Sequence, residues 1–121
     1  DEKGERGVII NISSGAAFEG QIGQSAYSGS KAGVNGMNIP AARELARYGI
    51  RVNSIAPGLF GTPMVKSLGE KVVNSLVEMC EAPKRMGEME EFAHTCSFLF
   101  ENGYMNGRIV RLDGATVMQA K

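Results

Sequence analysis

The sequence predicts an α/β fold that forms half of a doubly wound parallel sheet. Three short β-branched apolar runs, at residues 7–14, 50–56 and 107–112, indicate strands. Helical patterns fill the segments between them, and this alternation is typical of parallel strands joined by crossover helices. Three strands leave an open sheet edge and an uncovered face, so we expect further chain to complete the layer.

The first run, GVIINISS, ends in small polar residues, and we expect a buried strand over residues 7–14. Small and polar residues punctuated by glycine follow over 15–25 and indicate a loop. Apolar and small residues then recur at helical spacing over 26–48, which predicts a long helix closed by Gly49. Pro40 lies inside this helix, where it removes a backbone donor and predicts a local bend.

The second strand, over 50–56, is stopped by Pro57-Gly58. An interrupted amphipathic pattern over 62–82 follows, and we expect it to pack as a mobile lid over a site. A further amphipathic helix is predicted over 88–102, with Gly103 as its terminator.

Residues 107–112 form the third strand. Arg108 and Arg111 flank this strand, where they could contact a second subunit or remain solvated.

The composition excludes several classes of partner. The 121 residues contain 13 Lys plus Arg against 13 Asp plus Glu, and this balance gives no electrostatic reason to expect nucleic acid or an anionic membrane. No apolar run approaches the roughly 18 residues of a transmembrane helix, so we do not expect a membrane-spanning chain. The expected location is the cytoplasm, or the mitochondrial matrix in a eukaryote. Cys80 and Cys96 are expected to be reduced thiols, and the single His94 a packing or surface residue rather than a metal ligand.

The most informative stretch runs from residue 10 to residue 33. Tyr27 and Lys31 are four residues apart near the start of the long helix, so their side chains project from one face. An ammonium beside a phenol favours the phenolate, which makes Tyr27 a candidate general acid or base. Ser14 lies at the carboxyl end of the first strand, where open α/β sheets bind ligands, and its hydroxyl could bind a substrate oxygen.

Tyr and Lys at this spacing are common on solvated helix faces, so the pair alone is a weak signal. Ser13 and Asn11 are expected to be hydrogen-bonding residues at the strand end rather than catalysts. The signal becomes specific only in combination: a strand ending in Ser14, a small-residue loop, the Tyr-Lys helix, and a second strand ending in Pro57-Gly58 ahead of Thr62.

With the strings GVIIN, AAFEGQIGQSAYSGSKAG, GIRVNSIAPGLFGTP and RLDGA, the chain resembles the classical short-chain dehydrogenase/reductase family over essentially its whole length. The resemblance implies that residues 1–121 are the C-terminal part of a single Rossmann-type dehydrogenase domain. It also implies that the glycine-rich cofactor turn, the acidic residue that selects NAD and a catalytic Asn lie N-terminal of Asp1. On this expectation the chain alone does not bind the adenosine half of the cofactor.

The resemblance assigns roles residue by residue. It implies catalysis by Ser14, Tyr27 and Lys31, with Lys31 also binding the nicotinamide ribose. The positions expected to contact the cofactor are Tyr27, Lys31, Pro57, Gly58, Phe60 and Thr62. The positions expected to contact the substrate are Ser14, Gln21, Gln24, Met64 and Val65.

The implied reaction interconverts a secondary alcohol and a ketone with NAD, NADP not being excluded. The matched strings are most similar to members acting on 3-hydroxyacyl-CoA and 3-ketoacyl-CoA. An acyl-carrier-protein thioester, a steroid or a sugar-like alcohol remain alternatives, as does a non-catalytic interface module. The resemblance also implies a homotetramer and a small-molecule substrate.

Overall fold

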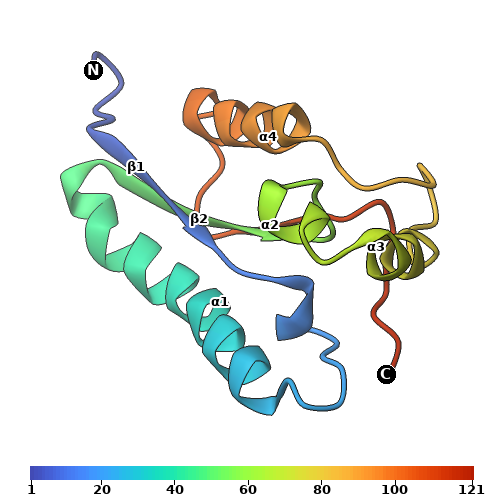
Figure 1. Ribbon diagram of the computed structural model, residues 1–121. Helices are drawn as coiled ribbons and strands as arrows, with labels where there is room; N and C mark the ends of the chain where they lie inside the picture. Colours follow the sequence, from blue (N-terminus) through green and yellow to red (C-terminus); the bar gives the residue numbers. More distant parts are fainter.

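The computed structural model describes residues 1–121, in which three parallel strands form one sheet (Figure 1). The strands are β1 (Gly7–Ile12), β2 (Ile50–Pro57) and β3 (Ile109–Leu112). They lie in the order β1-β2-β3, with Ile9 paired to Val52 and Ile55 to Val110. The predicted α/β fold with a parallel sheet is therefore confirmed.

β2 is the central strand, and its residues 51–56 are all buried. A central parallel strand is covered on both faces, so its side chains cannot alternate between core and solvent. Val52 and Ile55 of β2 and Leu99 from a following helix form the fully buried apolar centre. The other two strands lie at the edges, and each has one hydrogen-bonded neighbour.

The predicted long helix is confirmed as α1 (Ser25–Leu45), continued by the short 3-10 helix η2 (Ala46–Tyr48). Gly49 ends it in the left-handed conformation, with φ of 70°, which is the terminator that a glycine provides at low cost. Pro40 is accommodated inside α1 without interrupting it.

The segment predicted as an interrupted lid contains two helices, α2 (Pro63–Lys66) and α3 (Glu70–Val77). The side chain of Thr62 caps α2 by accepting a hydrogen bond from the Val65 N–H. Gly69, with φ of 97°, separates the two helices. The helical part therefore ends at Val77, earlier than the sequence pattern predicted.

The last predicted helix is α4 (Met89–Glu101). A capping box begins it, because Glu88 and Glu91 each accept a hydrogen bond from the other's backbone N–H. Figure 1 shows α1 and α4 on opposite sides of the sheet, which is the doubly wound arrangement. None of the helices has both the length and the apolar character needed to cross a bilayer.

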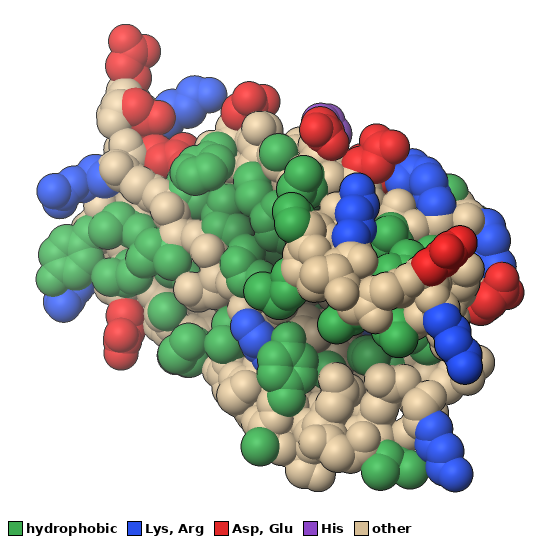
Figure 2. All heavy atoms as spheres, viewed as in Figure 1, with side chains coloured by type: hydrophobic (Ala, Val, Ile, Leu, Met, Phe, Trp, Pro, Cys, Tyr) green, Lys and Arg blue, Asp and Glu red, His purple; other side chains and the backbone are tan.

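Both cysteines are free thiols, Cys80 buried and Cys96 half-buried, and His94 is exposed, as the sequence predicted. Exposed apolar side chains lie on β1 and α4, and Figure 2 shows hydrophobic side chains gathered over these two elements. They include Ile9, Ile12, Phe98 and Phe100. The expected open edge and partly uncovered face are present.

Candidate active site

The predicted catalytic residues all lie where β1 ends. β1 stops at Ile12, two residues earlier than predicted, because Ser14 is the N-cap of a 3-10 helix, η1 (Gly15–Ala17). The Ser13 N–H still donates to the Ile55 carbonyl at 2.8 Å, so the chain follows the sheet until the residue before Ser14. Ser14 is therefore held at the carboxyl edge of the sheet.

The Ser14 hydroxyl accepts one hydrogen bond, and its proton is not bound by any protein group. Its oxygen accepts a hydrogen bond from the Ala16 N–H at 3.1 Å. Its O–H donates to no protein group and the side chain is half-buried, so it can donate to a ligand oxygen at this edge.

Lys31 is tied to the same strand end by two hydrogen bonds in opposite directions. Its ammonium donates to the Ile12 carbonyl at 3.0 Å, and its own carbonyl accepts from the buried Ser13 hydroxyl at 3.3 Å. Ser13 thus has the hydrogen-bonding role predicted for it. Because an ammonium has three N–H groups, Lys31 keeps donors free after binding Ile12.

Tyr27 lies one helical turn before Lys31, and the Lys31 nitrogen is 5.9 Å from the centre of its ring. The tyrosine side chain is 46% exposed, so its phenol is accessible to a ligand. The spacing of the two residues on α1 therefore places a cation beside a phenol, and the hydrogen bonds of Lys31 hold that cation at the end of β1, two residues before Ser14.

The residues at and after the end of β2 form a close-packed turn at Pro57 and Gly58 and, further on, a helix cap at Thr62. Pro57 ends the strand, and the Gly58 N–H donates to the Leu112 carbonyl at 2.9 Å. A β-carbon on Gly58 would lie 2.7 Å from that of Asp113, so only glycine fits this close approach. Thr62 uses its hydroxyl oxygen to cap α2, which leaves its proton free for another acceptor.

The structure does not bring the Phe60 ring together with Tyr27. Phe60 packs edge-on against Phe92 of α4, with ring centres 5.6 Å apart, and its backbone pairs with Gly87. It lines a cavity of about 430 Å³ on the α4 side of the fold. Its other lining residues include Pro83, His94 and Asp113, and none of the three predicted catalytic residues is among them.

The predicted substrate-side residues lie on two segments. Gln24 accepts a hydrogen bond from the Gln21 N–H at 2.8 Å, which closes the turn before α1. Met64 on α2 is 80% exposed and Val65 is half-buried. An apolar residue this exposed on a four-residue helix fits the predicted lid segment.

Sequence reasoning missed Arg111 as a structural link to this region. Its guanidinium donates to Glu19 through two nitrogens and to Asp113 at 2.8 Å, and lies 4.8 Å from the centre of the Phe18 ring. The hydrogen bond to the Glu19 carboxylate raises the pKa of Arg111 above its usual value. Glu19 and Arg111 are 92 residues apart, so no local pattern indicated their pairing.

The model of the short chain dehydrogenase family matches residues 2–73. The chain is 56% identical over 119 residues to human 3-hydroxyacyl-CoA dehydrogenase type-2, a match that covers 98% of this chain and 46% of the human protein. The chain belongs to the short-chain dehydrogenase family. The family resemblance seen in the sequence is therefore confirmed, and enzymes of this family use NAD(P).

Solved structures of this family agree with the fold. The crystal structure of 3-hydroxyacyl-CoA dehydrogenase type-2 from Mycobacterium avium has a TM-score of 0.95 and 49% identity, over 100% of this chain and 47% of that one. A 3-oxoacyl-[acyl-carrier protein] reductase from Brucella melitensis has a TM-score of 0.83 and 32% identity, over 94% of this chain and 43% of that one. The chain thus spans about half the length of these short-chain dehydrogenases.

Proposed function

We propose that this chain provides the catalytic half of an oxidoreductase that interconverts a secondary alcohol and a ketone. The observation that supports this most directly is the position of Lys31, whose ammonium binds the end of β1 beside both Tyr27 and the Ser14 turn. Membership of the short-chain dehydrogenase family supports the same reaction. In this mechanism Tyr27 transfers the proton, Lys31 provides a positive charge beside it, and Ser14 binds the substrate oxygen.

In the oxidation direction the Tyr27 phenolate takes the hydroxyl proton of the alcohol, the C–H bond of the carbinol carbon breaks, and its hydrogen leaves as hydride while the C=O bond of the ketone forms. When bound, the nicotinamide of the cofactor would supply the acceptor for that hydride. Ser14 donates its hydroxyl proton in a hydrogen bond to the substrate oxygen and keeps that oxygen within reach of the phenol. Lys31 stabilises the negative charge on Tyr27 in the deprotonated state.

The donor set at this edge fits the nicotinamide half of the cofactor. The free N–H groups of Lys31 can bind ribose hydroxyls, and the free proton of Thr62 can bind a carboxamide oxygen. Pro57 and Gly58 provide a tight turn at the end of β2, next to this set. We propose NAD as the cofactor, by analogy with the dehydrogenases that the chain resembles.

For the substrate we propose a 3-hydroxyacyl-CoA, because relatives at this level of identity are named for it. Gln21 and Gln24 in the loop before α1 and Met64 and Val65 on the lid would contact the acyl chain. A 3-oxoacyl-carrier-protein thioester is the alternative supported by the second structural match.

The sheet of this chain is proposed to be part of a larger domain. We propose that residues 1–121 form the C-terminal part of one Rossmann-type domain, whose remaining half holds the adenosine end of the cofactor. The open edge at β1, which has a single neighbouring strand, supports this. We further propose a homotetramer, located in the cytoplasm or in the mitochondrial matrix.

The test uses the full-length natural protein that contains this chain, after its intact mass has been measured. NADH formation with 3-hydroxybutyryl-CoA is compared between wild type, Tyr27→Phe and a matched control, Tyr104→Phe, whose ring is 99% exposed. We expect Tyr27→Phe to lower kcat by about 10²- to 10⁴-fold, because the proton acceptor is gone, and Tyr104→Phe to have no effect. Wild-type rates in Tyr27→Phe would overturn the catalytic assignment.

A further inference from the structure

Arg111 lies on β3, away from the predicted catalytic triad, yet its side chain contacts the turn that contains Ser14. Its Nη1 donates to Glu19 at 3.0 Å, its Nη2 donates to the other oxygen of the same carboxylate, and its Nε donates to Asp113 at 2.8 Å. The guanidinium also lies over the Phe18 ring, 4.8 Å from its centre. Such a planar fork fixes both the distance and the orientation of its carboxylate partner.

Phe18 and Glu19 belong to the same hydrogen-bonded unit as Ser14. The Phe18 and Glu19 N–H groups both donate to the Gly15 carbonyl, at 3.0 and 3.1 Å, and the Ala17 N–H donates to the Ser14 carbonyl at 3.0 Å. The Ser14 side chain in turn caps η1. Residues 18–19 and the Ser14 hydroxyl therefore belong to one short hydrogen-bonded turn.

The contact is also direct. A β-carbon on Gly15 would lie 3.6 Å from the Nη2 of Arg111, so the guanidinium packs against the backbone immediately after Ser14. Asp113 holds the other side of the same guanidinium, and Asp113 itself packs against Gly58 at the end of β2. Arg111 thus joins the turn after β1 to the turn after β2.

We infer that Arg111 is a positioning residue, which sets the place of the Ser14 hydroxyl through the Phe18–Glu19 turn. This inference rests on the proposed function, because it concerns the donor to the substrate oxygen. Arg111 makes no hydrogen bond to Tyr27 or Lys31, so its loss should change what Ser14 contributes and leave the proton acceptor in place.

The experiment is a double-mutant cycle in the full-length protein with 3-hydroxybutyryl-CoA and NAD. Arg111→Lys keeps the charge and loses the fork, and Ser14→Ala removes the hydroxyl. We expect Arg111→Lys to lower kcat about tenfold or more in the wild-type background, with the KM for NAD unchanged, since small misplacements of a reacting group cost up to about 10²-fold. In the Ser14→Ala background the same substitution should have no further effect on kcat.

Arg108→Lys is the matched control, because Arg108 is exposed beside the same strand and its side chain makes no hydrogen bond. If Arg111→Lys does not fold, Glu19→Gln replaces it, because this change leaves the guanidinium and weakens one partner. An equal loss of kcat with and without Ser14, or no loss in either background, overturns the inference. If Ser14→Ala and Tyr27→Phe both retain wild-type rates, the proposed function fails instead.

Discussion

The two ends of the sheet differ in how the donors of their polar side chains are paired. At the amino end, Arg51 of β2 is 6% exposed, pairs with Glu5 at 2.7 Å, and donates to the carbonyls of Leu99, Phe100 and Met105. At the carboxyl end, Ser14 and Lys31 keep unused donors that face solvent. A buried guanidinium with its donors paired contributes to stability, whereas free donors at an open end are available for chemistry.

Substitution of Lys31 tests the carboxyl end and has the largest expected effect. Lys31→Met removes the cation 5.9 Å from the Tyr27 ring and the donors proposed for the ribose. We expect kcat/KM for NAD to fall by about 10²-fold or more in the full-length protein. The free energy of unfolding should change by less than about 1 kcal/mol, because only the hydrogen bond to Ile12 is lost.

Lys71→Met on the exposed part of α3 is the control, measured by steady-state kinetics and urea unfolding. Wild-type kinetics in the Lys31→Met protein would mean that the free donors at the carboxyl end of the sheet do not take part in catalysis. The proposed functional difference between the two ends would then be wrong.

Substitution of Arg51 tests the amino end by stability rather than activity. Arg51→Met leaves three carbonyls and the Glu5 carboxylate without their donor. Since removal of one partner from a buried ion pair is strongly destabilising, we expect a loss of about 3 kcal/mol in the free energy of unfolding. Arg43→Met, at an exposed position of α1, should lose less than about 0.5 kcal/mol.

Urea denaturation of both variants makes this comparison. Equal stabilities for Arg51→Met and Arg43→Met would show that the hydrogen bonds of Arg51 add nothing beyond those of a solvated arginine.

Asn38 lies between the two ends and should have an intermediate effect. It is 1% exposed on α1, accepts from the Ser54 hydroxyl at 2.8 Å, and donates to the Arg108 carbonyl at 3.3 Å. Asn38→Ala leaves the Ser54 hydroxyl unpaired in the core, so we expect a loss of about 2 kcal/mol by urea unfolding. In the Asn38→Ala background, Ser54→Ala should lower the free energy of unfolding by less than it does in the wild type, because it removes the unpaired hydroxyl. Equal losses in the two backgrounds would contradict this coupling.

The elements of the fold were predictable because their signals are local. β-branched runs indicated the strands, and Gly49 indicated where the helical stretch of α1 and η2 ends, because glycine adopts the left-handed conformation at low cost. The common face of Tyr27 and Lys31 followed from helical spacing alone. The assignment of their roles needed the family resemblance, because spacing does not distinguish a catalytic pair from a solvated one.

The contacts that arrange the site were not predictable, because they join residues far apart in the sequence. The Lys31 bond to Ile12 spans 19 positions and the Arg111 bond to Glu19 spans 92. The orientation of Phe60 depends on Phe92 and Gly87, whose positions are fixed only after the chain has folded. Arg111 was expected to be a subunit contact or solvated, and neither expectation includes the intrachain bonds it makes.

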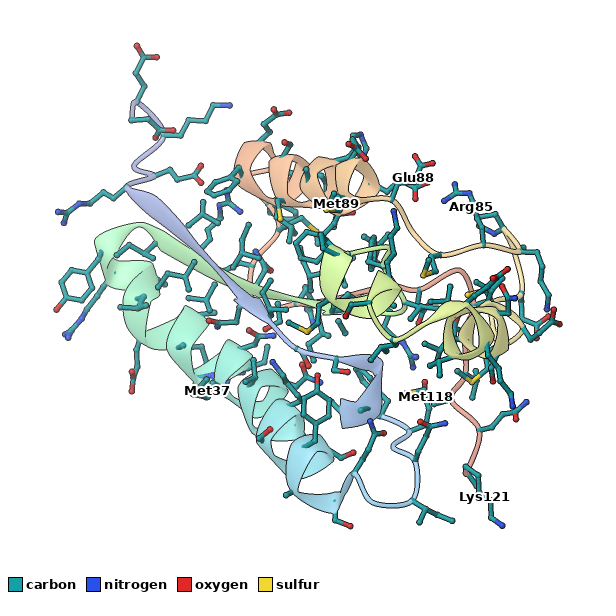
Figure 3. The ribbon with its side chains drawn as sticks, in the orientation of Figure 1. Met37, Arg85, Glu88, Met89, Met118 and Lys121 are labelled. Carbon is teal, nitrogen blue, oxygen red and sulfur yellow. The ribbon has the colours of Figure 1, made fainter.

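The smallest expected effect concerns an exposed ion pair at neither end of the sheet. Arg85 lies on the loop ahead of α4, as Figure 3 shows, and donates to both oxygens of Glu91 at 2.9 and 2.8 Å. These hydrogen bonds, with the backbone N–H of Glu88, lower the pKa of Glu91 from 4.5 to about 2. The carboxylate is therefore favoured in the folded state.

A lowered pKa stabilises the folded protein above the unfolded value and loses that contribution as pH falls. Between pH 4.5 and about 2 the unfolded chain takes up a proton at Glu91 before the folded chain does, so the free energy of unfolding declines through this window. Glu91→Gln removes the ionisable group, and we expect urea unfolding from pH 2 to 7 to show a shallower decline than wild type, with the two proteins converging near pH 2.

Glu90→Gln, on the same first turn of α4, is the matched control because its side chain makes no hydrogen bond or ion pair. It should keep the wild-type decline through this pH window. Both variants should differ little from wild type in 1 M salt, because an exposed pair is screened. Parallel curves for Glu91→Gln and wild type at low salt would mean that the pair with Arg85 is not maintained in solution.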